Sequence, residues 1–199
     1  MSDADLRKWD ERYCAGSYAE RPHATRLLED YLETLPRGNA LDIACGAGRN
    51  ALFLARAGFH VDAIDISPAG LERGRAAAVA EGLKINWICA DLDRGLDSIA
   101  GLESGYELIV MVRYVNMALL ADLIARVDER GCLLCEEHLR TRREVAGPRS
   151  AEFRLAPNQL LHAAAPLRVV FYREGIVVDP DGREAALAQL IGAGAGFDV

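Results

Sequence analysis

The 199-residue sequence has no long apolar run and no low-complexity segment. No stretch reaches the roughly 20 uninterrupted apolar residues that a bilayer-spanning helix requires. The N-terminus is charged where a secretory signal would be apolar. The five cysteines are odd in number and scattered along the chain, which argues against a disulfide framework. We therefore expect a reducing, cytoplasmic compartment.

Basic residues are also outnumbered. Thirty acidic residues against 23 basic ones give a net charge of -7 and a pI near 5.2. This balance disfavours binding to a phosphate backbone or an anionic membrane surface. We expect no nucleic-acid partner and no membrane partner. The remaining composition is globular, with 51% hydrophobic residues, and the length suits a single domain.

One cysteine pair, Cys132 and Cys135, has the C-x-x-C spacing of redox and zinc motifs. The pair lies in the apolar run 131–136, GCLLCE, which is typical of a buried strand. No second pair of ligands accompanies it. We interpret both cysteines as core residues and predict no metal site.

Short apolar runs alternate with helical stretches between residues 40 and 136. The predicted strands are 40–45, 61–66, 85–90, 108–112 and 132–135, and the predicted helices between them are 49–57, 68–81 and 119–130. Such alternation is typical of β-α-β units, which build a parallel sheet covered on both faces.

The flanking segments complete the fold. A helix over 24–35 precedes the alternating region, and a loop over 141–150, a short helix from Pro157 and strands over 168–173 and 185–191 follow it. A turn at 179–182 joins these last two strands. The predicted fold class is α/β: a Rossmann-like, doubly wound, mostly parallel seven-stranded sheet with a C-terminal antiparallel strand pair.

The most informative stretch is 41–50, LDIACGAGRN, where a predicted strand leads through a turn of small residues into a helix. Small residues let backbone amides approach a ligand at the carboxyl end of a strand. Gly46, Gly48 and Ala51 fit the dinucleotide pattern G-x-G-x-x-G/A, and Asp65 ends the next strand, where it suits ribose hydroxyls. The loop alone therefore allows a nicotinamide-dependent oxidoreductase.

Asp42 favours a different ligand. A carboxylate inside an apolar strand is costly to bury unless it is paired, and a pyrophosphate beyond it would gain nothing from the negative charge. S-adenosylmethionine offers an α-ammonium and a sulfonium and carries no phosphate. Asp91 ends the third predicted strand, where an adenine amino group would lie. Acids at the ends of three consecutive strands therefore favour S-adenosylmethionine as the cofactor.

Residues 41–68, LDIACGAGRNALFLARAGFHVDAIDISP, resemble the first two motifs of class I S-adenosylmethionine-dependent methyltransferases. The run from Gly48 to Asn50, the segment 147–161 and the segment 169–191 resemble the tellurite-resistance and thiopurine methyltransferase-like branch. This resemblance implies that Asp42, Ala44, Gly46 and Gly48 serve the methionine end of the cofactor, Asp65 and Ile66 the ribose, Asp91 and Leu92 the adenine, and Val112 and Arg113 the sulfonium. Asn50 is a further candidate for cofactor binding.

The sequence departs from the family pattern at two places. Ala44 stands where the superfamily usually has its first glycine. We expect alanine to be tolerated there if the backbone φ is below zero. The turn between the last two strands is short and keeps only Arg183 of the histidine–arginine pair seen in tellurite-resistance members.

The N-terminal segment WDERY, from Trp9 to Tyr13, resembles the lid of this family, whose aromatic residues cover the cofactor. The two rings are one helical turn apart and could face a sulfonium, an interaction of roughly 0.5–2 kcal/mol. Packing of the helix onto the domain is the alternative. We divide the single domain 1–199 into a lid and helix (1–38), a cofactor-binding core (39–138) and a substrate-side loop with closing strands (139–199).

Methyl transfer to a soft nucleophile needs positioning and water exclusion more than proton transfer, so we assign no catalytic residue. Tyr114, Asn116 and His138 follow the fourth and fifth strands and are the substrate-facing candidates. We predict an S-adenosylmethionine-dependent methyltransferase that acts on a small molecule, such as a thiol, a chalcogen oxyanion or another soft nucleophile. A nicotinamide-dependent oxidoreductase and a non-catalytic S-adenosylmethionine-binding module remain alternatives.

Overall fold

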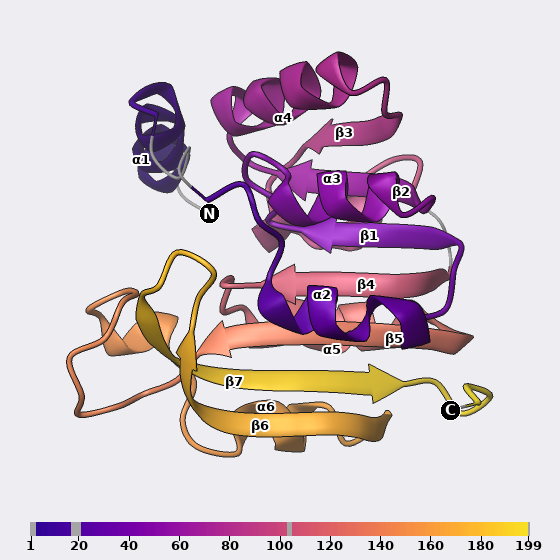
Figure 1. The fold of residues 1–199 in the computed structure, drawn as a ribbon, viewed down its shortest axis with the longest axis vertical. Coiled ribbons are helices and arrows are strands. Elements are labelled where there is room, and N and C mark those ends of the chain that lie inside the picture. Colours follow the sequence, from indigo (N-terminus) through magenta and orange to yellow (C-terminus); the bar gives the residue numbers. More distant parts are fainter. Residues whose placement is uncertain (1–2, 17–20, 103–104, 199) are drawn as a thin grey trace.

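The computed structural model describes residues 3–16, 21–102 and 105–198. The chain forms a seven-stranded sheet of order β3-β2-β1-β4-β5-β7-β6 with helices on both faces (Figure 1). The strands are β1 (Asn39–Ile43), β2 (His60–Asp65), β3 (Ile85–Cys89), β4 (Tyr106–Val112), β5 (Val127–His138), β6 (Arg168–Val178) and β7 (Glu184–Ala193). The α-helices are α1 (Asp3–Cys14), α2 (Arg26–Tyr31), α3 (Arg49–Arg56), α4 (Pro68–Ala80), α5 (Met117–Ala125) and α6 (Gln159–Ala163).

The strand directions match the predicted fold class. Neighbouring strands from β3 through β5 are parallel. β7 lies between β5 and β6 and runs antiparallel to both. The predicted doubly wound sheet with a C-terminal antiparallel pair is therefore confirmed, and the pair closes one edge of the sheet.

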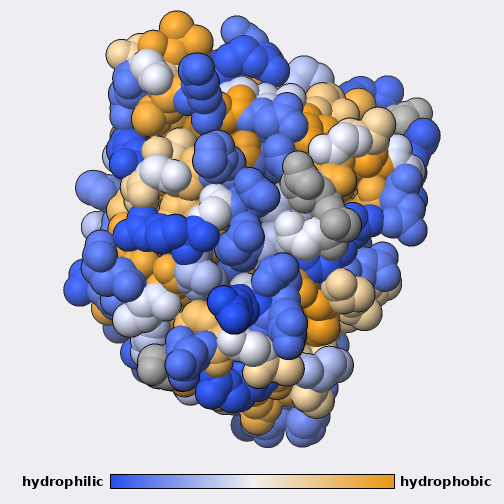
Figure 2. Space-filling model, turned by 90° about the vertical axis from the view of Figure 1, so that its right-hand side faces the viewer, coloured by the Kyte–Doolittle hydropathy of each residue, from blue (hydrophilic) through white to orange (hydrophobic). Residues whose placement is uncertain are grey.

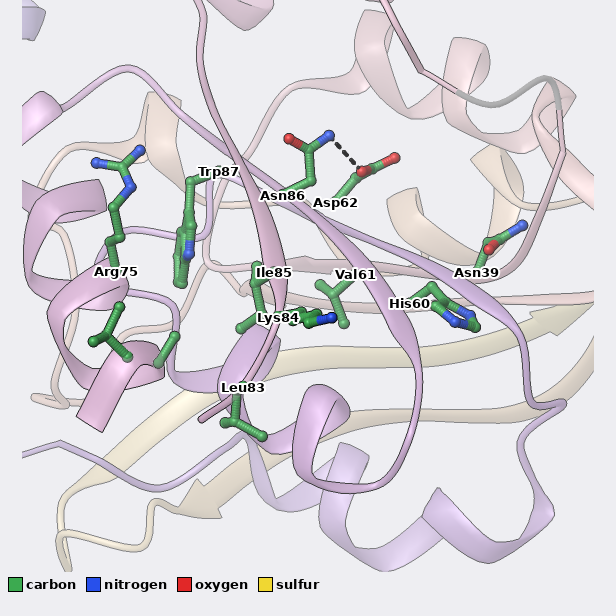
Figure 3. Close-up of a pocket in the computed structure, with 12 residues that line it drawn as sticks. Asn39, His60, Val61, Asp62, Arg75, Leu83, Lys84, Ile85, Asn86 and Trp87 are labelled. Carbon is green, nitrogen blue, oxygen red and sulfur yellow. Dashed lines mark hydrogen bonds between the residues drawn. The ribbon is translucent and has the colours of Figure 1, made fainter. Parts of the chain in front are cut away.

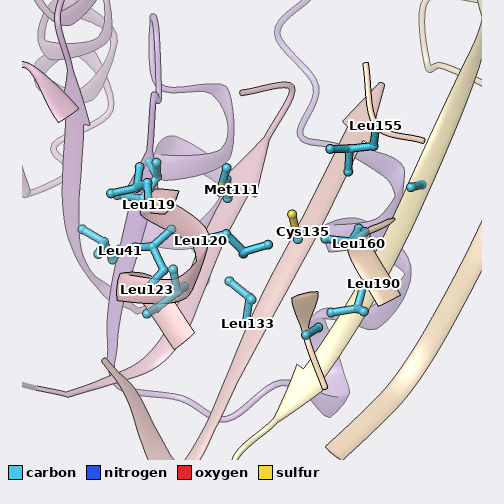
Figure 4. Close-up of a cluster of buried hydrophobic side chains, with 14 of the residues drawn as sticks. Leu41, Met111, Leu119, Leu120, Leu123, Leu133, Cys135, Leu155, Leu160 and Leu190 are labelled. Carbon is cyan, nitrogen blue, oxygen red and sulfur yellow. The ribbon is translucent and has the colours of Figure 1, made fainter. Parts of the chain in front are cut away.

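Apolar side chains on both faces of the sheet form the core. Leu133 of β5 joins a cluster that includes Leu120 of α5 and Leu160 of α6 (Figure 4). The next residue, Leu134, joins the opposite cluster with Leu28 of α2. Successive side chains of a strand point to opposite faces, so a strand covered on both faces must be apolar throughout.

Cys132 and Cys135 lie within β5 and are both fully buried. Cys132 packs in the cluster on the α2 face, whereas Cys135 packs in the cluster on the α5 face. Residues three apart in a strand point to opposite faces, so these two thiols cannot hold one ligand. The prediction that both are core residues is confirmed.

Several predicted element boundaries are wrong. The helix expected over 119–130 ends at Ala125, because Val127 already pairs with Tyr106 as the start of β5. The helix expected over 24–35 becomes α2 and a short 3₁₀ turn over 32–34. The helix expected from Pro157 begins at Gln159, because Asn158 has a left-handed backbone.

The closing hairpin is also longer than predicted, since β6 and β7 pair from Arg168 to Val178 and from Glu184 to Ala193. The predicted turn is confirmed, because the N–H of Gly182 donates to the carbonyl of Asp179 at 2.8 Å. At the start of α4, Ser67 Oγ accepts the N–H of Gly70 at 3.0 Å and Pro68 follows, as the sequence predicts.

The strand ends define two sides of the molecule. The carboxyl ends of β1, β2 and β4 point toward the side where α1 lies (Figure 1). Figure 2 views the opposite side, where hydrophilic residues separate small hydrophobic patches. Within the described parts of the chain, no helix is both long enough and apolar enough to cross a membrane.

Candidate functional site

The turn over 44–48 connects β1 to α3 through left-handed backbone. The φ angles are 53° at Ala44, 58° at Gly46 and 77° at Gly48. The condition for alanine at position 44, a φ below zero, is therefore not met. Glycine adopts such angles freely, whereas alanine loses on the order of 1–2 kcal/mol. The turn is tight enough to impose this conformation on a non-glycine residue.

Asp42 lies in β1 under this turn and is 1% exposed. Its Oδ2 accepts the N–H of Ala51, in the first turn of α3, at 2.9 Å. Burial raises the pKa of Asp42 to about 7, against the opposing effects of the Ala51 hydrogen bond and of Arg49. A cation bound beside this carboxyl group would favour its ionised form.

Asp65 ends β2 and is 7% exposed. Its Oδ2 accepts the N–H of Gly46 at 2.7 Å, and its Oδ1 accepts the N–H of Ser67 at 2.8 Å. Burial raises the pKa of Asp65 even though these two backbone donors lower it. The side chain thus joins the turn after β1 to the start of α4.

The other residues predicted to bind the cofactor differ in burial and in hydrogen bonding. Asp91 follows β3, and its Oδ1 accepts the N–H of Asp93 at 3.0 Å. Leu92 is 1% exposed in the core, whereas Ile66 is half-buried. Asn50 is 4% exposed, and its Oδ1 accepts the N–H of Thr25 at 3.0 Å. The Asn50 side chain of α3 therefore binds the backbone of the residue that precedes α2.

Arg113 follows Val112, which ends β4. Its guanidinium group lies between two carboxylates, with Nε 2.9 Å from Glu136 Oε1 and Nη2 2.7 Å from Asp179 Oδ1. Glu136 is 1% exposed, and its Oε2 accepts the Nε2–H of Gln189 at 2.6 Å. The sequence analysis placed Arg113 beside a sulfonium. It missed Glu136 and Asp179, which pair with Arg113, and Gln189, which binds Glu136.

Glu137 was also missed. It is 1% exposed at the end of β5, and its Oε1 accepts the N–H of Tyr114 at 3.1 Å. Its Oε2 is buried and has no hydrogen-bond partner in the part of the chain that the structure describes. Burial raises the pKa of Glu137 well above its usual range. The run of charged residues 136–138 after an apolar strand was the available signal, but it also suits a strand that emerges into solvent.

The structure brings two of the three substrate-facing candidates together. The Tyr114 hydroxyl and the Asn116 amide both donate to Asp93 Oδ1, at 3.2 and 3.1 Å. His138 lies apart from them and is 8% exposed, close to Gly147. Burial, with Arg113 as the next cause, lowers the pKa of His138 to about 3, so its imidazole is neutral at physiological pH.

The two aromatic residues of α1 also differ. The Tyr13 hydroxyl lies against Gly46, because a Cβ built on Gly46 would be 2.0 Å from that oxygen. The Trp9 ring instead contacts cations of its own helix, Arg12 at 4.9 Å and Lys8 at 5.9 Å from the ring centroid. Residues 17–20 of the predicted lid lie outside the described residues.

Residues 40–129 match the family model described as "Methyltransferase domain". TehB from Haemophilus influenzae superposes with a TM-score of 0.73 at 20% identity, over 93% of this chain and 67% of that chain. The magnesium protoporphyrin IX methyltransferase of Synechocystis PCC 6803, solved with bound S-adenosylmethionine, superposes with a TM-score of 0.57 at 16% identity, over 95% of this chain and 80% of that chain. This chain has the class I S-adenosylmethionine-dependent methyltransferase fold.

Curated sequences match part of the chain. It is 30% identical over 104 residues to the ubiquinone biosynthesis O-methyltransferase of Rickettsia conorii, a match that covers 52% of this chain and 36% of that protein. An uncharacterized protein of Mycobacterium tuberculosis is 34% identical over 91 residues, covering 46% of this chain and 33% of that protein. The chain spans about a third of the length of these curated relatives. The solved structures confirm the predicted fold, and the family match over residues 40–129 agrees with the predicted methyltransferase.

Two hollows lie at opposite ends of the methyltransferase sheet. The groove in Figure 3 runs beside β3 and includes Asn39 and His60, the first residues of β1 and β2, so it lies away from the strand ends that carry the acids. A smaller hollow lies at the carboxyl ends. Its charged lining residues are Arg21, His23, Arg49, Arg113, Asp179 and Asp181.

Proposed function

We propose that this chain transfers the methyl group of S-adenosylmethionine to a small molecule with a soft nucleophile, such as a thiol or a chalcogen oxyanion. The observation that carries the proposal is Asp42, buried under the turn 44–48 with a pKa of about 7. The α-ammonium of S-adenosylmethionine suits this carboxyl group because a nearby positive charge stabilises its ionised form. A pyrophosphate would be repelled there.

Asp65 supports the same cofactor. Its oxygens already accept backbone N–H groups from Gly46 and Ser67, and carboxylate oxygens have further lone pairs for the ribose diol. In this proposal Asp42, Ala44, Gly46, Gly48 and Asn50 form the methionine end, Asp65 and Ile66 the ribose end, and Asp91 and Leu92 the adenine end. Val112, Arg113, Trp9 and Tyr13 surround the sulfonium.

The bound cofactor would supply an electrophilic methyl group on a sulfonium. The protein would then position the acceptor and exclude water, which suffices for a soft nucleophile. We place the acceptor near Tyr114, Asn116 and His138. Arg113 adds little net positive charge beside a sulfonium, because Glu136 and Asp179 both pair with it.

The remaining sequence predictions belong to the same proposal. Residues 1–38 would act as lid and helix, 39–138 as the cofactor-binding core and 139–199 as the substrate side of one domain. A small-molecule acceptor, rather than nucleic acid, follows from the net charge of -7. Cytoplasmic location also remains a prediction.

Calorimetry with S-adenosylmethionine, S-adenosylhomocysteine and NADH tests the cofactor. We expect both S-adenosyl compounds to bind and NADH not to compete with them. Displacement by NADH at a similar concentration would replace this proposal with the oxidoreductase alternative.

A labelled-methyl screen across thiols, selenite, tellurite and small oxyanions then tests transfer and acceptor together. The screen is necessary because the fold does not specify the reaction. The [4+2]-cyclase SpnF superposes on this chain with a TM-score of 0.63 at 16% identity, over 85% of this chain and 80% of that chain. Cofactor binding without transfer to any acceptor would favour the non-catalytic binding module.

A further inference from the structure

The Asp10 side chain joins helix α1 to the start of α4. Asp10 Oδ1 accepts two hydrogen bonds at 2.8 Å, one from Ser67 Oγ and one from the N–H of Ala69. The N–H groups of a helical first turn have no partner within the helix. Ser67 Oγ accepts the N–H of Gly70, and Asp10 satisfies the N–H of Ala69. A carboxylate from α1 therefore completes the N-terminal cap of α4, where the helix dipole also favours negative charge.

Ser67 also connects Asp10 to Asp65, the residue predicted to bind the ribose. Ser67, which donates its hydroxyl to Asp10, also donates its N–H to Asp65 Oδ1 at 2.8 Å. Asp65 Oδ2 in turn accepts the N–H of Gly46 at 2.7 Å. A continuous hydrogen-bonded chain thus leads from α1 through Ser67 and Asp65 to the turn after β1. Ser67 itself is fully buried.

Tyr13, one turn after Asp10 on α1, fills the space that two glycines leave. A Cβ on Gly46 would lie 2.0 Å from the Tyr13 hydroxyl, and a Cβ on Gly70 would lie 3.1 Å from the Tyr13 ring. The Tyr13 carbonyl accepts a hydrogen bond from Arg73 Nη1 at 3.3 Å. Asp10 and Tyr13 therefore attach the same helix to α4 and to the turn 44–48.

We propose that Asp10 is a positioning residue that holds α1 over the cofactor end of the sheet. The inference rests on the proposed function, because it takes the cofactor to lie on Asp65 and the turn 44–48. With Asp10 bound to Ser67 and Ala69, Tyr13 stays on Gly46 and Asp65 keeps its orientation. When that contact breaks, α1 leaves and the cofactor end opens. Asp10 thus sets the affinity for the cofactor and its rate of release without touching it.

The test compares Asp10→Ala with Glu11→Ala, the neighbouring exposed acid on the same helix. Both variants remove one negative charge, but only the first removes the acceptor for Ser67 and Ala69. Hydrogen exchange over residues 3–14 without ligand should be at least fivefold faster in Asp10→Ala than in Glu11→Ala. S-adenosylhomocysteine should bind Asp10→Ala roughly tenfold more weakly, because charge-assisted hydrogen bonds are lost. Its release should be faster by a similar factor.

Asp10→Asn retains an acceptor oxygen and should recover part of both effects, and it also serves if Asp10→Ala does not fold. Equal exchange over residues 3–14 in Asp10→Ala and Glu11→Ala would show that Asp10 does not hold α1, whether or not any ligand binds. Faster exchange with unchanged affinity for S-adenosylhomocysteine would show that Asp10 only attaches α1 to α4. That result would overturn its positioning role in cofactor binding. Failure of the unmodified protein to bind S-adenosylhomocysteine would instead count against the proposed function.

Discussion

The ends of β1 and β2 and the ends of β4 and β5 are stabilised by different groups. At the ends of β1 and β2, Asp42 and Asp65 accept hydrogen bonds from backbone N–H groups. At the ends of β4 and β5, Arg113 and Glu136 bind side chains, including Gln189 on β7. Backbone donors are present in any sequence that forms the same turns. An interaction between two side chains, by contrast, forms only when both residue types are present.

This difference predicts different consequences of mutation. An acid held by backbone groups can be replaced at moderate cost to the fold, so its loss should mainly weaken ligand binding. A buried charge that loses its partner remains desolvated, and removing one member of such a pair typically costs 3–5 kcal/mol. We therefore expect substitutions at the ends of β1 and β2 to change affinity and substitutions at the ends of β4 and β5 to change stability.

The largest effect is expected at the ends of β4 and β5. Arg113→Ala should lower the free energy of unfolding by roughly 3–5 kcal/mol, because Glu136 is left buried without its cation. Urea denaturation measures the loss. Arg143→Ala is the matched control, since its pair with Glu184 is exposed at 62% and 51% and should contribute less than about 1 kcal/mol. Similar losses in the two variants would contradict the distinction between the two ends.

Asp65→Ala tests the cofactor end. We expect weaker binding of S-adenosylmethionine by roughly 1.5–3 kcal/mol, because charged acceptors for the ribose hydroxyls are removed. Calorimetry on folded protein measures the change, with Asp122→Ala, an exposed acid on α5, as the control. Unchanged affinity in Asp65→Ala would remove this residue from the site.

The pH dependence of binding tests Asp42. Its pKa is raised to about 7 by burial, so the carboxyl group is neutral in mildly acidic solution and ionised above pH 8. The cationic α-ammonium prefers the ionised form, and affinity for S-adenosylhomocysteine should rise between pH 6 and 8 by up to about tenfold per unit. The profile should then level off. Asp42→Asn should abolish this dependence, whereas a rise that persists in Asp42→Asn would assign it to another group.

The raised pKa of Asp42 also predicts how the stability of the ligand-free protein depends on pH. Between about pH 4 and 7 the folded chain holds a proton on Asp42 that the unfolded chain has lost. The contribution of Asp42 to stability should therefore fall as pH rises through this window. Urea denaturation of Asp42→Asn should show a smaller loss of stability from pH 5 to pH 8 than the unmodified protein. Parallel profiles would show that burial of Asp42 does not govern this range.

The smallest effect is expected in the turn after β1. Ala44→Gly should raise the free energy of unfolding by about 0.5–1 kcal/mol, because a left-handed backbone that is unfavourable for alanine becomes acceptable. Ala47→Gly is the control, since Ala47 is not among the residues with positive φ, and it should be neutral or destabilising. Thermal denaturation distinguishes the two variants. A loss of stability in Ala44→Gly would mean that the alanine methyl group contributes packing that outweighs the strain.

Local sequence patterns predicted the turn after β1 and the acids on either side of it well. Asp42, the turn and Asp65 lie within one contiguous stretch, so strand periodicity and small residues were enough to place them together. The cap at Ser67 and Pro68 was likewise readable. The start of β5 was predicted as helix because residues 127–130 have helical composition, although they lie in β5 and Val127 pairs with Tyr106 of β4. The sign of φ at Ala44 depends on how the turn closes, which residue type does not reveal.

The sequence by itself determined the alternation of strands and helices, the turn after β1 and the acids at the strand ends, because burial periodicity and turn chemistry act between near neighbours. Only the tertiary structure decided that β7 inserts between β5 and β6, that Arg113 joins Glu136 to Asp179, and that Asp10 caps α4. These contacts join residues far apart in the chain, where each charged side chain has many possible partners. Packing of the whole sheet selects among those partners, since it sets which charges are buried within reach of one another.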